Sequence, residues 1–446
     1  ESSAASDVYK RQGHNGQESC RMKRFSKTVV VILVILIFIT ALWAWKGELL
    51  PGGLPRFLPQ KETAEETESL TASEESVNST ESPTEETVPG ALQEENGTEQ
   101  EGEGGPSVSQ ETGYAYGLLT EEEQQLYREM LQAITGFGRD AELSTLNPDL
   151  LETVFNSIMA DHPEIFYVDG YTYTKHTLGE EIHKITFSGQ YTLTQEQVRE
   201  REEGIERYSR QALEGIHTGM DDYQKIKYIY DYMIEHTDYR LDAPENQTIC
   251  SVFLYGESVC QGYAKAFQFL CGRLGIPAVL VTGRVKNGEP HAWDMVLADG
   301  EWYYVDPTWG DAYYLMGDDD PAWQGKTRPS VNYDYLLVTT QQLLQTHKID
   351  NAFPLPECTS MTDNYYVREN AYFESVDETK LSNLFARGYE EDKGIVTLKC
   401  ADQTVYQDMK KTLLDDQKIF DYLRGDNASA AYVDTQEQFT LSFWLE

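Results

Sequence analysis

The sequence predicts an α+β fold in which a cysteine-bearing helix is followed by strands joined through tight turns. Residues 260–274 carry apolar side chains at intervals of three and four, which is the period of a helix with one buried face. Two turn signals follow, Asn287-Gly288 and Asp299-Gly300, each between runs of strand-forming residues. Helical patterns before this segment, and a mixed pattern after it, predict an N-terminal extension and a small C-terminal α+β region.

The length and charge of the chain limit its organisation and its partners. At 446 residues it is too long for one ordinary hydrophobic core, so at least two folded units are expected. The net charge is -39, and a field of that sign repels phosphate backbones. Nucleic acid is therefore excluded as an expected partner.

An apolar segment near the N-terminus predicts a membrane anchor. Within residues 28–46, the run 29–45 has Thr40 as its single polar residue, which is the short end of a membrane span. Basic residues gather before the run, so residues 1–27 are expected in the cytoplasm and the chain after the run outside the cell. The first 12 residues are interpreted as a non-native tail. The competing interpretation is a cleaved signal peptide.

Residues 47–113 are expected to form a disordered acidic linker. Between positions 48 and 113 there are sixteen glutamates against Arg56 and Lys61, and few large apolar side chains. Such a chain cannot bury enough surface to offset the entropy of ordering. The chain after this linker, called the head below, is expected to fold into three parts. They are an N-terminal α+β extension (114–215), a catalytic core (216–330) and a C-terminal α+β region (331–446).

Local signals place the main elements of the head. Thr120 and Glu123 form a capping box, which predicts a helix start. Helical spacing recurs over "DLLETVFNSIMADHP", around residues 195–215, and in "DDYQKIKYIYDYMIEH". The C-terminal region shows the strand "GIVTLKCA", a helix near 404–424 and a strand pair within "AAYVDTQEQFTLSFWL".

Cys260 is predicted at the first turn of its helix. There the unpaired amides and the helix dipole favour a thiolate, and the same amides can hold a developing oxyanion. Cys271 is on the same apolar stripe but deep in the helix, so it is assigned to the core. Gly275 and Pro277 follow the stripe and predict the helix end.

The hairpin after the helix brings a histidine and an aspartate together. A strand is expected over 278–285, followed by two more. If Asp299-Gly300 is a two-residue turn, its flanking residues pair directly, and His291 and Asp306 are diagonal neighbours on one face. A slip of one residue would turn Asp306 to the opposite face. The pair therefore depends on that turn.

Cys260, His291 and Asp306 supply the three groups that thiol catalysis needs. A nucleophilic thiol requires a base within hydrogen-bond reach and a third group that orients the base. Taken singly, each residue is more often structural: a core cysteine, a satisfied histidine, a turn aspartate. Their order, on a helix and then on adjacent hairpin strands, favours a catalytic site.

Three stretches in this region resemble the successive motifs of the transglutaminase-like superfamily, a papain-like thiol fold, in its bacterial membrane-anchored type. They are "GESVCQGYAKAFQFLCGRLGIPAVLVTG", "HAWDMV" and "WYYVDPTWGD", and the resemblance covers roughly residues 220–320. It implies a papain-like α+β core in which the helix of Cys260 packs on an antiparallel sheet. It also implies Cys260 as nucleophile, His291 as general base and acid, and Asp306 as the residue that orients His291.

The surroundings of the three residues suggest a cleft and no metal. Gln261, Tyr263, Trp293 and Trp309 are candidates for the substrate cleft, although aromatic residues in strands are more often part of a core. No EF-hand loop, Cys-x-x-Cys or His-x-x-x-His pair is present, so we expect no cofactor and no obligatory metal.

The sequence therefore predicts an extracytoplasmic enzyme that performs cysteine-dependent acyl transfer on protein or peptide substrates. The outcome is crosslinking if an amine resolves the acyl-enzyme, and proteolysis or deamidation if water does. The alternative is a catalytically idle, surface-anchored module that binds proteins or cell-wall components. The expected partners are a protein or peptide substrate, the cell membrane and cell-wall components.

Overall fold

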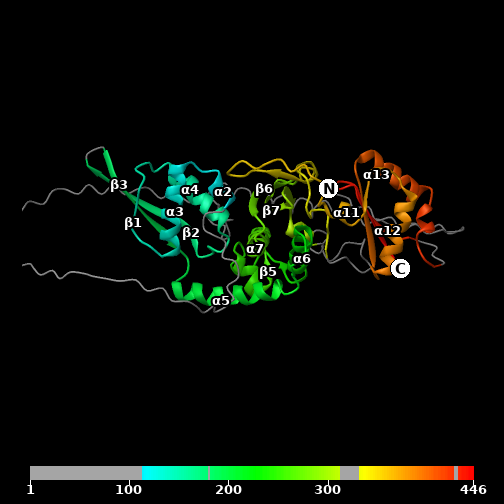
Figure 1. The fold of residues 1–446 in the computed structure, drawn as a ribbon, viewed down its shortest axis with the longest axis horizontal. Helices are drawn as coiled ribbons and strands as arrows, with labels where there is room; N and C mark the ends of the chain where they lie inside the picture. Colours follow the sequence, from blue (N-terminus) through cyan, green and yellow to red (C-terminus); the bar gives the residue numbers. More distant parts are fainter. Residues whose placement is uncertain (1–112, 179–180, 312–330, 426–429, 446) are drawn as a thin grey trace, which may run out of the picture.

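The computed structural model describes residues 113–178, 181–311, 331–425 and 430–445. The predicted tail, membrane anchor and acidic linker lie outside these ranges. Among the described residues, no helix has both the length and the apolar character needed to span a bilayer. Figure 1 shows the described part with the N-terminal extension at one end, the core in the middle and the C-terminal region at the other end.

The N-terminal extension is a small α+β unit built from local signals. Its helix α3 begins with the predicted capping box, in which Thr120 accepts from the Glu123 amide and Glu123 accepts from the Thr120 amide. Its sheet has the order β1-β3-β2, all antiparallel. The elements are α2 (Tyr114–Gly117), α3 (Glu121–Thr135), β1 (Ala141–Leu143), α4 (Leu150–Asp161), β2 (Val168–Leu178), β3 (Glu181–Tyr191) and α5 (Gln195–Ala212).

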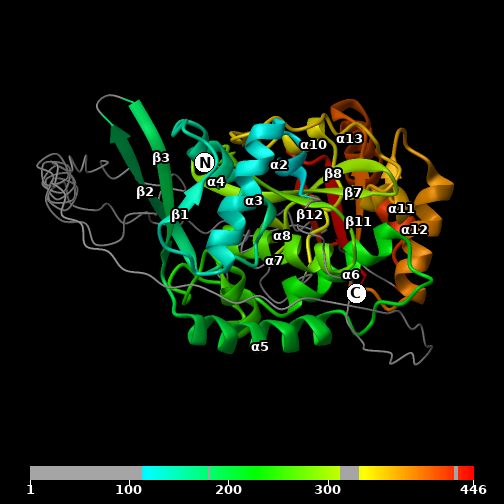
Figure 2. The same cartoon turned by 60° about the vertical axis from the view of Figure 1, so that its left-hand side comes forward.

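The polar helix α5 forms one edge of the molecule. It runs along the lower side of the extension and the core in Figure 2. Most of its residues are exposed, and Val198 and Ile205 are buried, which agrees with the polar helix expected around residues 195–215. The extension and the core share one cluster of buried apolar side chains, including Phe155, Tyr230 and Phe267. They therefore pack as one body.

The core is the predicted helix-on-sheet arrangement. Helix α7 packs on strands β6 and β7 of a four-stranded antiparallel sheet. The core elements are α6 (Asp222–Glu235), β4 (Asp238–Tyr239), the π-helical turn η1 (Ser251–Tyr255), β5 (Glu257–Ser258), α7 (Cys260–Arg273), β6 (Ala278–Val285), β7 (Pro290–Ala298), β8 (Glu301–Val305) and α8 (Pro307–Gly310). The fold is thus α+β.

The register of the β7–β8 hairpin confirms the predicted turn. Ala298 pairs with Glu301, and the pairing continues to Asp294 opposite Val305. Asp299 and Gly300 have φ values of 48° and 90°, and two positive φ angles are what a type I′ hairpin turn requires. His291 and Asp306 consequently meet at the same end of the sheet.

The fourth strand of the core sheet comes from beyond the boundary expected at residue 330. The sheet order is β8-β7-β6-β9, and β9 (His347–Ile349) pairs antiparallel with β6. The expected core of 216–330 therefore cuts through this sheet. A three-residue strand has no periodicity of its own, so only its pairing with β6 reveals it.

The rest of the C-terminal region has its own core and sheet, of order β10-β11-β13-β12. The helix expected over 404–424 was wrong: it is three short helices, and Gln417 between the last two has φ of 59°, which an α-helix cannot continue. The remaining elements are α10 (Thr340–Leu343), α11 (Tyr365–Arg368), β10 (Tyr372–Phe373), α12 (Glu378–Glu390), β11 (Ile395–Cys400), α13 (Gln403–Lys410), η3 (Lys411–Asp415), η4 (Lys418–Asp421), β12 (Tyr432–Thr435) and β13 (Thr440–Trp444).

Candidate active site

Cys260 is the first residue of α7 and is partly exposed. The preceding residue, Val259, has extended backbone and makes no side-chain cap bond, so no capping side chain occupies the amides of the first turn. The side chain of Cys260 packs on Ala264, Leu280 and Ala292, which belong to the helix itself and to both neighbouring strands. The thiol is therefore held at the end of the helix where amides and the dipole favour negative charge.

Gly262 allows the helix to start at this position. A Cβ atom there would lie 2.8 Å from the carbonyl oxygen of Asn246 and would also overlap the hydroxyls of Ser251 and Ser258. Those two hydroxyls hydrogen-bond each other at 2.6 Å and close the loop before the helix. The glycine is thus required by close approach of backbone and side chains rather than by an unusual φ angle.

His291 and Asp306 form a buried hydrogen-bonded pair. Nε2 of His291 donates to Oδ2 of Asp306 at 2.7 Å, and the side chain of Asp306 is fully buried. The other oxygen, Oδ1, accepts from the amide of Trp309 at 3.0 Å, because Asp306 is the N-cap of α8. With Nε2 occupied, the imidazole has Nδ1 left, and the Cys260 side chain is close enough to contribute to the raised pKa of His291.

The electrostatics of the pair favour a charged imidazole. Burial opposes the imidazolium, but the Asp306 carboxylate, and after it the Cys260 side chain, outweigh burial and raise the pKa of His291 to about 10. Burial also disfavours the Asp306 carboxylate, yet the charge and hydrogen bond of His291, together with the hydrogen bond of His347, hold its pKa well below the ordinary range. The interactions of His291 therefore stabilise its charged, imidazolium form beside the Asp306 carboxylate.

His291 is expected to stay protonated far above the ordinary histidine range. Its raised pKa contributes stability that is fully present below about pH 6.5 and is lost as the pH rises through about 10. Titration of the ¹⁵N-labelled ring by NMR should therefore give a midpoint near 10, and Cys260→Ala should lower that midpoint. A midpoint near 6.5 in the wild-type protein would contradict the ion pair.

The structure adds a residue that the sequence did not reveal. His347, on β9, is fully buried, and its Nε2 lies 3.0 Å from Oδ2 of Asp306. It is separated from Asp306 by 41 residues, and no motif links the two. The signal that could have found it is the pairing of β9 with β6, which no local pattern predicts.

His347 also revises the expectation about metals. His291, Asp306 and His347 form a group whose potential ligand atoms all lie within 4.8 Å of one another, and it arises from β7, the start of α8 and β9 rather than from a short motif. Both Nε2 atoms, however, approach the same oxygen at 2.7 and 3.0 Å. These are hydrogen-bond distances in which each nitrogen carries a proton, whereas a metal would need both nitrogens deprotonated.

The four cleft candidates have different positions. Tyr263 and Trp293 are fully buried, so the expectation that they wall a cleft was wrong. The hydroxyl of Tyr263 donates to the Thr237 carbonyl at 2.6 Å, which makes it part of the core. Trp309 is half-buried and packs against His291 and His347, with ring centroids 5.9 and 4.6 Å away.

Gln261 lines a cavity of about 770 Å³ beside the start of α7. The cavity lies between this helix, the extension and the chain after β9, and Leu280 both lines it and contacts Cys260. Its walls are mainly apolar, with Phe155, Met159, Phe166, Leu193, Leu280 and Phe353. Lys265, one turn along α7 from Gln261, also lines it. The cavity is large enough for an extended side chain of a substrate.

Replacing Lys265 by methionine is expected to change how stability depends on pH. Lys265 is 5% exposed, and burial lowers its pKa to about 8 from the ordinary 10.5. The charged form of this lysine therefore costs the folded state about 3 kcal/mol at neutral pH, and that cost is lost as the pH rises from about 8 to 10.5. The free energy of unfolding of Lys265→Met relative to wild type should accordingly fall by about 3 kcal/mol over this range.

Denaturant unfolding measured across this pH range tests the expectation. Lys348→Met is the matched control, because Lys348 is exposed and its loss should change stability by less than about 0.5 kcal/mol. A difference in the free energy of unfolding between Lys265→Met and wild type that does not change with pH would show that the charge of Lys265 is not its cause.

The fold and the site together define the class. Residues 210–307 match the family model of the transglutaminase-like superfamily, so this segment is similar to a transglutaminase-like core domain. The match includes Cys260, His291 and Asp306. The match supports, in general terms, a papain-like thiol enzyme.

Individual relatives are distant. The chain is 28% identical over 105 residues to the mouse (Mus musculus) kyphoscoliosis peptidase, and the aligned part covers 20% of this chain and 16% of that protein. Among solved structures, a TGase superposes with a TM-score of 0.24 at 16% identity, covering 36% of this chain and 47% of its own. The periplasmic domain of TgpA from Pseudomonas aeruginosa, bound to ethylmercury, gives 0.19 at 17% identity, covering 29% and 57%. TM-scores this low establish no shared substrate.

Proposed function

We propose that the protein is a cysteine-dependent acyltransferase or hydrolase acting on carboxamide or peptide bonds of proteins. The observation that carries the proposal is the arrangement of Cys260 against His291, which is hydrogen-bonded to the buried carboxylate of Asp306 at 2.7 Å. A binding module has no need of a thiol paired with an oriented imidazole.

The chemistry follows from this arrangement. The Cys260 thiolate attacks the substrate carbonyl carbon, and the negative charge that develops on its oxygen faces the first-turn amides of α7. The C–N bond breaks as the His291 imidazolium gives its proton to the leaving amine or ammonia. A thioester remains on Cys260. His291, now neutral, takes a proton from an incoming amine or water, which attacks the thioester and releases the thiolate.

Asp306 stays ionised through this cycle. Its low pKa means that it orients His291 and offsets the imidazolium charge without accepting the proton. Trp309 covers the imidazole edge and limits the directions from which water can approach. The acyl group of the substrate would extend toward the cavity that begins at Gln261.

The location in this proposal is extracytoplasmic. It is supported by the basic residues that precede the apolar segment 29–45 and by the acidic stretch that follows. The head would then act on surface proteins or on peptides of the cell wall. A reporter fused after residue 446 tests the orientation: activity of an export-dependent reporter supports it, and activity of a cytoplasm-dependent reporter contradicts it.

The reaction is tested by incubating the full chain with a glutamine-containing peptide and a labelled primary amine. Mass spectrometry distinguishes amine incorporation, deamidation and cleavage, and each must disappear in Cys260→Ala. Amine incorporation would identify a transferase, and cleavage or deamidation a hydrolase. If a panel of peptides yields none of the three, and acyl-fluoride or acyl-ester probes leave no thioester on Cys260, the enzyme proposal fails and the idle binding module becomes the better reading.

A further inference from the structure

His347 occupies a position that the proposed chemistry does not yet explain. It is on β9, hydrogen-bonds Oδ2 of Asp306 at 3.0 Å, and lies among aromatic rings. The centroids of Trp309, Trp293 and Tyr335 are 4.6, 4.9 and 5.5 Å from its ring centroid. Such packing leaves the imidazole one orientation, so its second nitrogen, Nδ1, has a defined partner.

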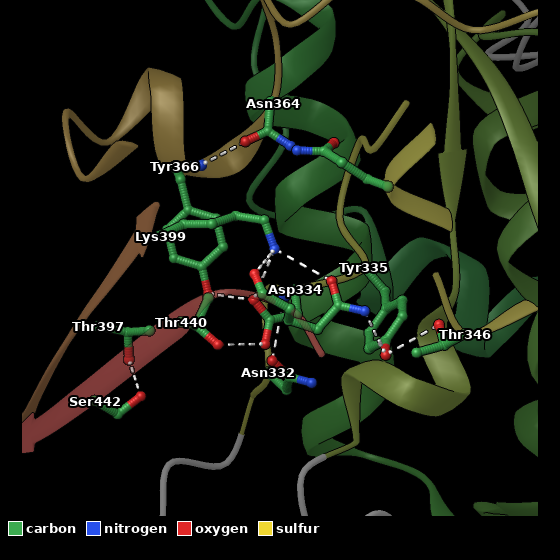
Figure 3. Close-up of polar contacts among 12 residues, drawn as sticks. Asn332, Asp334, Tyr335, Thr346, Asn364, Tyr366, Thr397, Lys399, Thr440 and Ser442 are labelled. Atoms are coloured by element: carbon green, nitrogen blue, oxygen red, sulfur yellow. Dashed lines mark hydrogen bonds and ion pairs between the residues drawn. The ribbon is translucent and has the colours of Figure 1, made fainter. Parts of the chain in front are cut away.

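That partner begins a chain of hydrogen bonds leading away from the site. Nδ1 of His347 lies 2.9 Å from Oγ1 of Thr346, and the same Oγ1 lies 3.4 Å from the hydroxyl of Tyr335. Figure 3 shows the Tyr335 and Thr346 side chains pointing at each other. The backbone carbonyl of Tyr335 also accepts from the amide of Asp306 at 3.0 Å. Tyr335 therefore holds Asp306 directly and through the histidine.

The chain continues into the C-terminal region. Nε2 of Gln438 donates to the Tyr335 hydroxyl at 3.0 Å, and Oε1 of Gln438 accepts from Nζ of Lys399 at 3.2 Å. Lys399 is buried and pairs with Asp334 at 3.4 Å, and Asp334 also accepts from Tyr366 at 3.0 Å. Figure 3 shows this group with Asp334 at its centre. All these side chains are buried, so water does not compete for the bonds.

The direction of donation along the chain is determined by Lys399. A lysine ammonium only donates, so the oxygen of the Gln438 amide must face it and the amide nitrogen must face Tyr335. The Tyr335 oxygen then accepts from Gln438, and its proton goes to Thr346. The Thr346 proton goes in turn to Nδ1 of His347 at 2.9 Å, which is a nearer acceptor than the carbonyl of Leu343 at 3.5 Å, and this leaves the histidine proton on Nε2, facing Asp306.

We propose that His347 is a positioning residue for the Cys260 site, and that the C-terminal region holds it in the tautomer that donates to Asp306. The inference rests on the proposed function. Asp306 would then be fixed by three donors: two imidazoles on Oδ2 and the Trp309 amide on Oδ1. A carboxylate fixed from both sides keeps His291 aimed at the thiol, which is what catalysis by an oriented base requires.

Replacing His347 tests the proposal in the full chain. His347→Leu removes the donor and keeps an apolar side chain, and His347→Gln keeps an N–H donor at a similar reach. We expect His347→Leu to lower kcat about 10- to 100-fold with KM within about twofold, and His347→Gln to recover kcat to within about fivefold of wild type. Equal losses in both folded variants, or wild-type kcat in His347→Leu, would overturn the positioning role.

The role of the C-terminal region has a separate test. Tyr335→Phe removes the hydroxyl that links Thr346 to Gln438 and keeps the ring that packs on His347. It should lower kcat about three- to tenfold. Because the hydroxyl acts through His347, the double variant Tyr335→Phe/His347→Leu should be no slower than His347→Leu alone. If the two losses in kcat multiplied in the double variant, the two residues would act independently, and the proposed chain of hydrogen bonds would be overturned.

Two further readouts keep this inference separate from the proposed function. The Nε2–H proton of His291 gives an NMR resonance whose position reports its bond to Asp306, and it should move in His347→Leu and stay near wild type in His347→Gln. This holds whether or not a substrate is turned over, so an unchanged resonance in His347→Leu would count against positioning.

Activity that requires added Zn²⁺, and is lost with a chelator, would instead assign His291, Asp306 and His347 to a metal and overturn the proposal.

Discussion

Replacement of Cys260 by alanine is expected to lower kcat/KM by about 10⁴-fold or more, to the level of the uncatalysed reaction on the substrates it accepts. The thiolate forms the covalent bond in the first step, and the described structure places no second nucleophile against His291. The fold should be unaffected, because the Cys260 side chain is partly exposed and alanine is favourable in a helix.

Cys271→Ala is the matched control on the same helix. Cys271 is fully buried, and burial raises the pKa of its thiol well above the ordinary value, so it is a core side chain and not a nucleophile. Turnover should persist in this variant, with a stability loss of about 1–2 kcal/mol. A residual rate in Cys260→Ala similar to that of wild type would disprove thiol catalysis.

Alkylation should show the same difference between thiols. Burial raises the pKa values of Cys250, Cys358 and Cys400 to about 12, so these thiols are protonated near neutral pH. Peptide mapping after brief iodoacetamide treatment is expected to find Cys260 modified ahead of these three. Modification of Cys260 no faster than a free model thiol would remove the support for a thiolate.

Asp306→Asn is expected to cause the second large loss, about 10³- to 10⁴-fold in kcat. The carboxylate accepts hydrogen bonds from both His291 and His347, and an amide that fills the same space offers one oxygen and a donor. An N–H facing Nε2 of His291 would force the proton onto Nδ1 and turn the lone pair away from the thiol. Loss of the negative charge would also lower the pKa of His291 below its value of about 10.

Asp294 supplies the control for this substitution. Like Asp306 it is fully buried, but it lies on β7, and neither of its side-chain oxygens has a hydrogen-bond partner among the described residues. Burial, and then the charge of Asp306, raise its pKa well above the ordinary value, so the folded state disfavours its ionised form. Asp294→Asn should therefore keep kcat and gain stability, because the unfolded state loses the advantage of ionising the carboxyl.

The two aspartates together make the test specific. Loss of activity in Asp306→Asn alone would assign the effect to the hydrogen bonds with His291 and His347. Equal losses in both variants would indicate that any amide in this part of the sheet disturbs the core. Circular dichroism and denaturant unfolding of each variant separate that outcome from a loss at the site.

Much of the central fold was predictable because its signals are local. The helix from Cys260 to Arg273 follows from one apolar stripe and a terminating glycine, and β6 from a single apolar run. The hairpin register follows from Asp299 and Gly300, whose positive φ angles few other residues adopt at low cost. Because a strand alternates with a period of two, that register also brings His291 to Asp306.

The errors have one physical origin, which is that burial depends on neighbours distant in the sequence. Trp293 and Tyr263 were placed at a cleft because aromatic residues near a nucleophile suit that role, yet packing against β9 and α6 buries them completely. The helix expected after residue 403 stops where Gln417 turns to a left-handed conformation. The anchor and linker predicted within residues 1–112 lie outside the described residues and remain predictions.

Chain order alone accounts for the nucleophile, its base and the aspartate, since a helix start and one tight hairpin suffice to bring them together. His347 has no such signal. It reaches Asp306 because β9 adds to the edge of β6, and it keeps its proton on Nε2 because Tyr335, Gln438 and Lys399 converge from two other parts of the chain. Hydrogen bonds between residues tens of positions apart depend on tertiary packing, and no periodicity in the sequence records them.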